Sequence, residues 1–144
     1  MKSLTKGKAY TNYRLKTRTL PVFNEFHDMF YTLIDEKYVK TIPTMITEQM
    51  CPIVLAHFIM GDGNFGVKDK RVRIYTNHFT FQECKMIANA ITFRCGIQCE
   101  VLFDRLSKNQ EKQYILTIGK SQLEKLREAI IPHMHTSIMY KVGQ

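Results

Sequence analysis

The chain has 144 residues, 44% of them hydrophobic and 24% charged, with a formal net charge of +8. This length and apolar content suffice for the core of one domain or slightly more. No apolar run approaches the roughly 20 residues needed to cross a bilayer, so we do not expect a membrane-spanning protein. The excess of Lys and Arg favours DNA, RNA or an anionic membrane surface as a partner, and a merely soluble basic protein is the alternative.

The N-terminal third predicts a strand and a helix. Period-two alternation predicts a strand from Tyr10 to Thr19. Pro21 and the three- and four-residue spacing of apolar side chains predict a helix over residues 22–33 that packs on a sheet. A loop is expected over residues 36–50. The predicted strand carries a basic comb on one face, formed by Arg14, Lys16 and Arg18.

An apolar stretch at the centre of the chain predicts a buried helix. Ile53 to Met60 is apolar almost all round, which at helical spacing requires burial on several sides. Gly61-Asp62-Gly63 is expected to end this helix. Two strands are predicted next, over residues 64–68 and 71–76.

The C-terminal half predicts a helix, a hairpin and a second helix. Thr80 and Glu83 have the spacing of a capping box for a helix that ends at Arg94, where Cys95-Gly96 suits a left-handed cap. Residues 98–105 and 113–118 predict two strands joined by a polar loop. The last helix should begin near Ser121 and end before Pro132. The predicted order is helix, two strands, helix, two strands, helix.

The four cysteines show no Cys-x-x-Cys pair, which most four-cysteine zinc sites contain. We expect reduced and mostly buried thiols. His133 and His135 lie two positions apart without a cysteine nearby, which is weak support for a metal site.

Four segments together resemble one known family. Residues Leu55 to Gly63 match the LAGLIDADG motif. Three flanking matches follow the same order along the chain: Lys40-Thr41-Ile42-Pro43, Thr76-Asn77-His78-Phe79-Thr80-Phe81-Gln82-Glu83, and Ile138-Met139-Tyr140-Lys141. The chain resembles the two-motif LAGLIDADG homing endonucleases encoded in organellar introns, over most of residues 10–142.

The resemblance implies an α+β fold in which helices cover one face of a curved antiparallel sheet, the saddle. It implies a basic N-terminal extension over residues 1–9, the rear strand and helix of a first unit over 10–50, and a complete αββαββα unit over 51–144. The first motif helix of such a protein would precede residue 1. By analogy with the family we expect an organelle, the mitochondrion in particular.

The family also implies a catalytic constellation. Asp62 matches the acid that binds divalent metal, here Mg²⁺, together with the Gly61 carbonyl. Lys40 and Lys141 match the two lysines near the attacking water. Taken without the resemblance, Asp62 would be a turn residue that ends a helix, and either lysine would be a solvated surface side chain.

The saddle of the family lies in the major groove of DNA, so its outward side chains are candidates for contacts with nucleic acid. Basic and aromatic residues interleave in one predicted hairpin, although an ordinary charged hairpin has the same composition. The candidates are Arg14, Lys16, Arg18, Lys68, Lys70, Arg71, Arg73, Tyr75, Arg105 and Lys108.

The sequence departs from the family in having a single motif, so this chain supplies one carboxylate where the family uses two. The departure favours a binding protein, inactive as a nuclease alone, that holds structured RNA in an organellar ribonucleoprotein such as an intron or ribosome. The first alternative is a DNA endonuclease completed by a second chain or a homodimer. The second is a decaying reading frame that folds without a selected function. In each case we expect a protein or second copy to cover the Ile53–Met60 helix.

Overall fold

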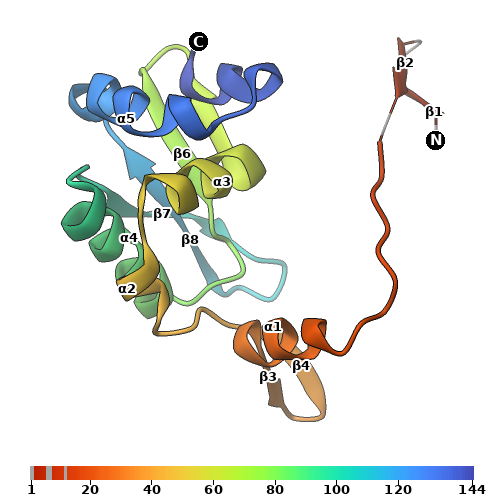
Figure 1. Ribbon diagram of the computed structural model, residues 1–144. Helices are drawn as coiled ribbons and strands as arrows, with labels where there is room; N and C mark the ends of the chain where they lie inside the picture. Colours follow the sequence, from red (N-terminus) through yellow and green to blue (C-terminus); the bar gives the residue numbers. More distant parts are fainter. Residues whose placement is uncertain (1, 6–7, 12) are drawn as a thin grey trace.

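The computed structural model describes residues 2–5, 8–11 and 13–144. The N-terminal part begins with a hairpin of β1 (Lys2–Thr5) and β2 (Lys8–Thr11), followed by an extended segment over residues 13–20. Helix α1 (Val22–Phe30) comes next and leads into a second hairpin, β3 (Tyr31–Ile34) and β4 (Lys37–Lys40). The first hairpin stands away from the rest of the molecule (Figure 1).

The predicted strand over residues 10–19 is wrong for most of its length. Strand β2 ends at Thr11, and residues 13–20 have no regular secondary structure; position 12 lies outside the described residues. Tyr13 and Leu15 are 94% and 92% exposed. Alternation specifies a strand only where a neighbouring strand accepts its backbone hydrogen bonds, and this segment pairs with no strand in the described part of the chain.

The helix and the loop predicted next are also partly wrong. Helix α1 ends at Phe30, and none of its residues is buried, so it does not pack on the main sheet as expected. Within the predicted loop, residues 37–40 form β4 and residues 46–49 form the short helix α2. Asp35 and Glu36 have φ values of 47° and 63°, the pair of positive angles that a tight two-residue hairpin turn requires.

The rest of the chain forms the predicted unit, an α+β fold with one antiparallel sheet. Its sheet has the strand order β5-β6-β8-β7. The elements in chain order are α2 (Ile46–Gln49), α3 (Pro52–Asp62), β5 (Gly63–Gly66), β6 (Arg71–Tyr75), α4 (Phe81–Cys95), β7 (Glu100–Leu106), β8 (Lys112–Ile118), a 3₁₀ turn (Lys120–Gln122), α5 (Leu123–Ile130) and two 3₁₀ segments (Ile131–His133 and Thr136–Val142).

Local sequence signals account for the helix ends of this unit. Pro52 occupies the first turn of α3, where its missing N–H costs nothing. Thr80 and Glu83 form the predicted capping box at the start of α4, and Gly96 ends it with a φ of 66°. Helix α5 ends at Ile130, before Pro132 as predicted, and Pro132 lies in the 3₁₀ turn that follows it.

The core lies between the sheet and the helices α3, α4 and α5, all of which lie on one side of it (Figure 1). Its centre consists of fully buried residues from the sheet and from all three helices: Leu55, Ile59, Val72, Ile74, Ile91, Leu116, Ile118, Leu126 and Ile130. Cys84 and Cys99 are buried, whereas Cys51 and Cys95 are half-buried, so two of the four thiols are less buried than expected. No helix in the described part of the chain is long and apolar enough to span a membrane.

Candidate active site and nucleic-acid interface

Asp62 is the last residue of α3, and its side chain is exposed at the end of the apolar helix. The two flanking glycines differ in their surroundings. A Cβ at Gly63 would collide with the carbonyl oxygen of Ile59 and lie 2.7 Å from its Cγ2 atom, so only glycine fits there. A Cβ at Gly61 would meet nothing within 4 Å. Gly61 therefore leaves open space beside Asp62.

Lys141 holds the end of α3 in place. Its ammonium group donates hydrogen bonds to the carbonyl oxygens of Met60 and Gly61, both at 2.8 Å. A cation at a helix C-terminus satisfies carbonyls that have no partner within the helix and offsets the helix dipole. Lys141 therefore binds the residue directly before Asp62, at the carbonyl that the resemblance implies as a metal ligand.

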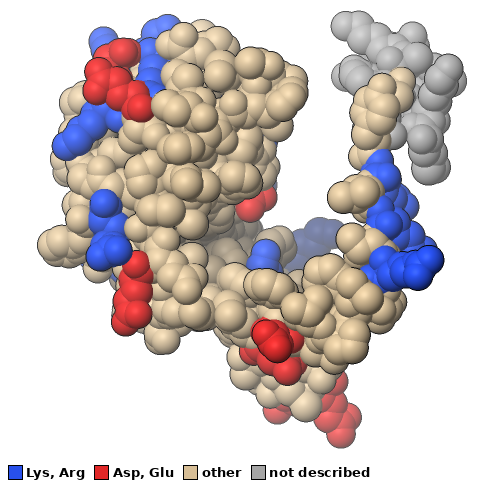
Figure 2. All heavy atoms as spheres, in the orientation of Figure 1, with Lys and Arg blue, Asp and Glu red and all other residues tan. Residues whose placement is uncertain are grey.

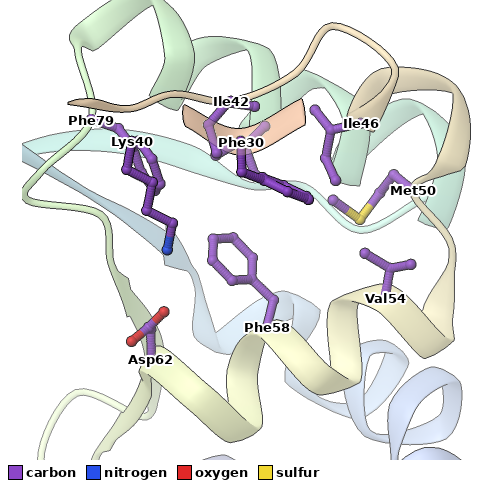
Figure 3. A pocket seen from close by; sticks show the side chains of 10 residues that line it. Phe30, Lys40, Ile42, Ile46, Met50, Val54, Phe58, Asp62 and Phe79 are labelled. Atoms are coloured by element: carbon purple, nitrogen blue, oxygen red, sulfur yellow. The ribbon is translucent and has the colours of Figure 1, made fainter. Parts of the chain in front are cut away.

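Lys40 approaches the same site from β4. Its ammonium nitrogen lies 5.7 Å from the centre of the Phe79 ring, a distance at which a cation is attracted to an aromatic face. Lys40 and Asp62 line one end of an apolar cavity of about 280 Å³. The Lys40 side chain extends toward the side of the cavity where Asp62 lies, and Phe58 separates this end from Val54 (Figure 3).

The oxygens at the end of α3 suit one half of a Mg²⁺ site. Mg²⁺ prefers carboxylate and carbonyl oxygen, and Asp62 provides a carboxylate, whereas the Gly61 carbonyl already accepts from the Lys141 ammonium. Among the residues that the structure describes, no group of three or more His, Cys, Asp or Glu side chains could hold a metal ion. Neither His133 nor His135 belongs to a group of that size. Further ligands would have to come from water, a phosphate or another chain.

The strand register shows which saddle candidates share a face. Across the sheet, Arg73 pairs with Thr117 and Thr117 pairs with Glu100, so these three side chains point the same way. Val72 and Ile74, on either side of Arg73, are fully buried against the helices. The row through Arg73 therefore lies on the face turned away from the helices, and we call this the outer face of the sheet.

The saddle candidates fall into three groups. Arg71, Arg73 and Tyr75 alternate on the outer face of β6, and Arg105 joins them because it pairs with Gln113 beyond a register shift in β7. Lys68 and Lys70 lie in the turn between β5 and β6, and Lys108 lies in the turn between β7 and β8. Arg14, Lys16 and Arg18 are exposed on the extended segment and not on a strand, so the basic comb of the sequence prediction does not form as part of the sheet.

Several outer-face residues were missed because charge and aromaticity were the only signals used. The register adds polar and apolar side chains to this face: Asn64, Glu100, Leu102, Gln113, Ile115 and Thr117. Alternation along each predicted strand could have identified them once one buried residue fixed the inward face.

Acidic neighbours restrain two of the basic candidates. Asp69 pairs with Arg73, and this hydrogen bond holds the pKa of the Asp69 carboxyl below its usual value. Asp104 accepts from Arg105 Nε at 2.8 Å and from Asn77 Nδ2 at 2.7 Å, and these contacts, Arg105 first, lower the pKa of Asp104. Both ion pairs orient an arginine on the outer face.

Charge is unevenly distributed over the face that carries α3. Lys and Arg side chains gather along the extended segment that precedes α1, whereas the surface over α3 is almost uncharged (Figure 2). Ile53, His57 and Gly61 repeat at four-residue spacing and are all exposed, with Ile53 at 51%. This exposed stripe of α3 runs up to Asp62.

Comparison with known proteins agrees with this geometry. The family model described as "LAGLIDADG DNA endonuclease family" matches residues 1–126. The chain is 30% identical over 141 residues to the intron-encoded endonuclease ai4 of Dictyostelium discoideum, covering 94% of this chain and 80% of that protein. It is 30% identical over 137 residues to the cytochrome b mRNA maturase bI2 of Debaryomyces hansenii, covering 95% of this chain and 48% of that protein.

A solved structure shares the fold. The homing endonuclease I-WcaI bound to its DNA recognition sequence superposes with a TM-score of 0.67 at 19% identity, covering 83% of this chain and 51% of that one. The predicted saddle fold is thereby confirmed. On the match of the family model and the identity with the Dictyostelium endonuclease, this chain belongs to the LAGLIDADG DNA endonuclease family.

Proposed function

We propose that this chain binds structured RNA in an organellar ribonucleoprotein, an intron or a ribosome of the mitochondrion, and does not cleave DNA by itself. The observation that carries the proposal is a basic outer sheet face combined with a single carboxylate, Asp62, at the end of the motif helix. Binding needs the first feature alone, whereas metal-dependent cleavage needs more ligands than the described residues supply.

Arg71, Arg73 and Arg105 support the binding half of the proposal. Guanidinium groups on one face of a sheet can contact successive phosphates, and such contacts fix the position of a helix without reading its sequence. RNA is preferred to DNA because two relatives are named as mRNA maturases and because A-form helices are recognised by shape and phosphate position. The net charge of +8 supports either nucleic acid.

Crosslinking tests the proposed ligand directly. Ultraviolet crosslinking of the chain in its native organelle, followed by sequencing of the attached nucleic acid, should recover a discrete set of RNA positions. Charge reversal on the outer face, Arg71→Glu with Arg73→Glu, should abolish recovery, whereas Lys125→Glu on the helical side should leave it unchanged. Recovery of DNA alone, or of no nucleic acid, would contradict the RNA proposal.

The second candidate function is a DNA endonuclease completed by another chain or by a second copy. The open space beside Gly61 and the uncharged stripe of α3 favour it, because two motif helices can pack closely only where small or apolar side chains meet. Asp62 would then be one of two carboxylates that share Mg²⁺. Lys40 and Lys141 would lie beside the cleaved phosphate.

A cleavage assay separates the two functions. Under the leading proposal, the purified chain with Mg²⁺ leaves a duplex containing the candidate intron-insertion sequence intact. A double-strand break that Asp62→Asn abolishes would establish the endonuclease. Asp62 is exposed and is not among the hydrogen-bonded side chains of the described residues, so Asp62→Asn should keep the fold.

In both functions we propose that a protein or a second copy covers α3. Sedimentation of the purified chain and of Ile53→Glu checks this point. Ile53 is 51% exposed, so the substitution should leave the thermal midpoint unchanged while it weakens self-association or co-purification of a partner. A chain that stays monomeric and recovers no partner from its organelle would contradict the covered helix.

A further inference from the structure

A second cleft lies on the outer face of the sheet, away from Asp62. It has a volume of about 110 Å³ and is lined by Arg71, Gln98, Glu100, Thr117, Gly119, Ser121 and Gln122. The register explains its position. Thr117 pairs with Glu100, and Gly119 directly follows Ile118, the last residue of β8, which pairs with Val72 next to Arg71. The cleft therefore lies at the ends of three neighbouring strands.

Gly119 leaves the floor of this cleft open. A Cβ at this position would meet nothing within 4 Å, so the missing side chain creates space that no neighbour fills. The φ angle of Gly119 is −75°, which any residue adopts. Glycine is therefore not required here by the backbone, and the open floor is the consequence of its small size.

Three polar side chains of the cleft, Arg71, Glu100 and Thr117, are not fully paired within the described residues. Arg71 and Glu100 carry opposite charges, but neither is among the ion pairs of the described residues. Thr117 is 1% exposed, and its buried hydroxyl oxygen has no hydrogen-bond partner. An unsatisfied buried hydroxyl costs free energy unless a ligand or water completes it. The Arg71 guanidinium and the Glu100 carboxylate are therefore the groups of this cleft that are available to a polar ligand.

The side-chain amide of Gln122 can also donate a hydrogen bond to a ligand in the cleft. The Gln122 side-chain oxygen accepts from the backbone N–H of Gln98 at 3.1 Å, so its nitrogen is left to donate. Gln98 Nε2 lies 3.5 Å from Glu100 Oε1, at the limit of a hydrogen bond, which leaves the carboxylate mostly available. The cleft thus offers a guanidinium and an amide as donors and a carboxylate as acceptor.

Shape decides what kind of nucleic acid can enter. In a duplex the base edges form the floor of a groove, and protein side chains project into it. A recess in the protein requires the opposite arrangement, in which a base projects from the nucleic acid into the protein. Unpaired bases of RNA loops and bulges do so, and proteins recognise them through their Watson–Crick and Hoogsteen edges.

We propose that the cleft over Gly119 binds one unpaired guanine of the nucleic acid that the outer face holds, an inference that rests on the proposed binding function. Guanine carries an acceptor, O6, next to two donors, N1–H and N2–H₂, along one edge. Arg71 donates to O6 and the Glu100 carboxylate accepts from the two donors. Adenine, cytosine and uracil do not present one acceptor beside two adjacent donors.

Four hairpin RNAs that differ in a single bulged nucleotide, guanine, adenine, cytosine or uracil, test the inference by fluorescence anisotropy. The wild-type chain should bind the guanine hairpin on the order of ten to a hundred times more tightly than the other three. Replacing the guanine with inosine, which lacks the N2 amino group, should remove part of that preference. Glu100→Gln should remove most of it.

Gly119→Leu provides the matched blocking variant, since it fills the cleft at a backbone angle that leucine adopts. It should bind all four hairpins equally, and Gly119→Ala should fall between it and wild type. Thermal unfolding midpoints close to wild type verify the fold. Arg105→Met, on the same face but outside the cleft, should weaken all four hairpins alike and keep the guanine preference.

The outcomes separate the cleft from the binding function. Wild type that binds all four hairpins equally, with Gly119→Leu unchanged, overturns the guanine site and leaves nucleic-acid binding intact; the cleft then holds water. Wild type that binds none of the hairpins, at low salt and with its fold verified, overturns both. Guanine preference that Gly119→Leu abolishes supports both.

Discussion

The Lys141 ammonium lies 2.8 Å from the carbonyl oxygen of Gly61, and this contact joins the C-terminal 3₁₀ segment to the end of the motif helix. A second bond at 2.8 Å to Met60 makes the link bidentate. The position of the Asp62 backbone therefore depends on a residue 79 positions later, through a side chain rather than through sheet pairing. Arg127 secures the same segment by donating from Nε to the Val142 carbonyl at 2.9 Å.

Lys141→Met should destabilise the fold by about 1–3 kcal/mol, because the partly buried Met60 carbonyl and the exposed Gly61 carbonyl both lose a charged donor. Urea unfolding followed by circular dichroism measures the change. Lys120→Met, an exposed lysine in a 3₁₀ turn, is the control and should remain within about 0.5 kcal/mol of wild type. Equal midpoints for the two variants would show that Lys141 does not support α3.

Arg105→Met should weaken nucleic-acid binding in a salt-dependent way. If Arg105 contacts a phosphate, the slope of log affinity against log salt should become shallower by about one unit. Lys125→Met on α5 is the control, because it removes the same charge from the helical side of the molecule. It should change neither the affinity nor the slope beyond a small uniform effect. Titrations at several salt concentrations check this, and equal slopes for both variants would place the nucleic acid elsewhere.

The second unit was largely predictable because its signals are local. The capping box of Thr80 and Glu83, the glycine after Cys95 and the apolar stretch of α3 each depend on residues within one or two turns. Family motifs then identified Asp62, Lys40 and Lys141, and the structure brings Lys40 and Asp62 to one cavity and Lys141 to the same helix end.

The first 50 residues were less predictable because their structure depends on contacts that local pattern does not specify. Residues 13–20 alternate like a strand, yet they have no strand beside them in the described part of the chain. The β3–β4 hairpin turns at Asp35 and Glu36, two residues in a left-handed conformation that lacks the usual glycine or asparagine signal. The cleft over Gly119 was invisible in the sequence, since it requires the register of three strands.

Asp69→Asn should strengthen nucleic-acid binding several-fold at neutral pH. Arg73 lowers the pKa of Asp69, so the carboxylate is charged throughout the neutral range and competes with phosphate for the guanidinium. A pKa that folding lowers contributes to folding stability above the ordinary aspartate value of 3.8, and that contribution is lost as the pH falls further. Wild-type affinity should therefore show no change from this pair between pH 5 and 8. An unchanged affinity in Asp69→Asn would exclude Arg73 from the interface.

Glu83→Ala should loosen the connection between the segment that follows β4 and the start of α4. The Glu83 carboxylate accepts from Thr80 N at 2.8 Å within the capping box and from Ile42 N at 2.9 Å in the segment after β4. Its removal should cost about 1–2 kcal/mol of stability and expose residues 41–45 to limited proteolysis. Glu124→Ala on α5, where the carboxylate is exposed and bound to Arg127, is the control. The same cleavage pattern in both variants would contradict this role of Glu83.

The Cys99 thiol should resist alkylation in the native protein while Cys51 reacts. Cys99 is 8% exposed, and burial raises its pKa to about 12, so its thiolate is scarce below that pH. In the unfolded chain the thiol loses its proton near its ordinary pKa of 9, so the folding stability that is present below pH 9 declines as the pH rises toward 12. Cys99→Val should flatten this decline. Iodoacetamide labelling read by mass spectrometry, with the unfolded chain as reference, measures both thiols. Labelling of Cys99 at the rate of Cys51 would show that the sheet end beside β7 opens in the native state.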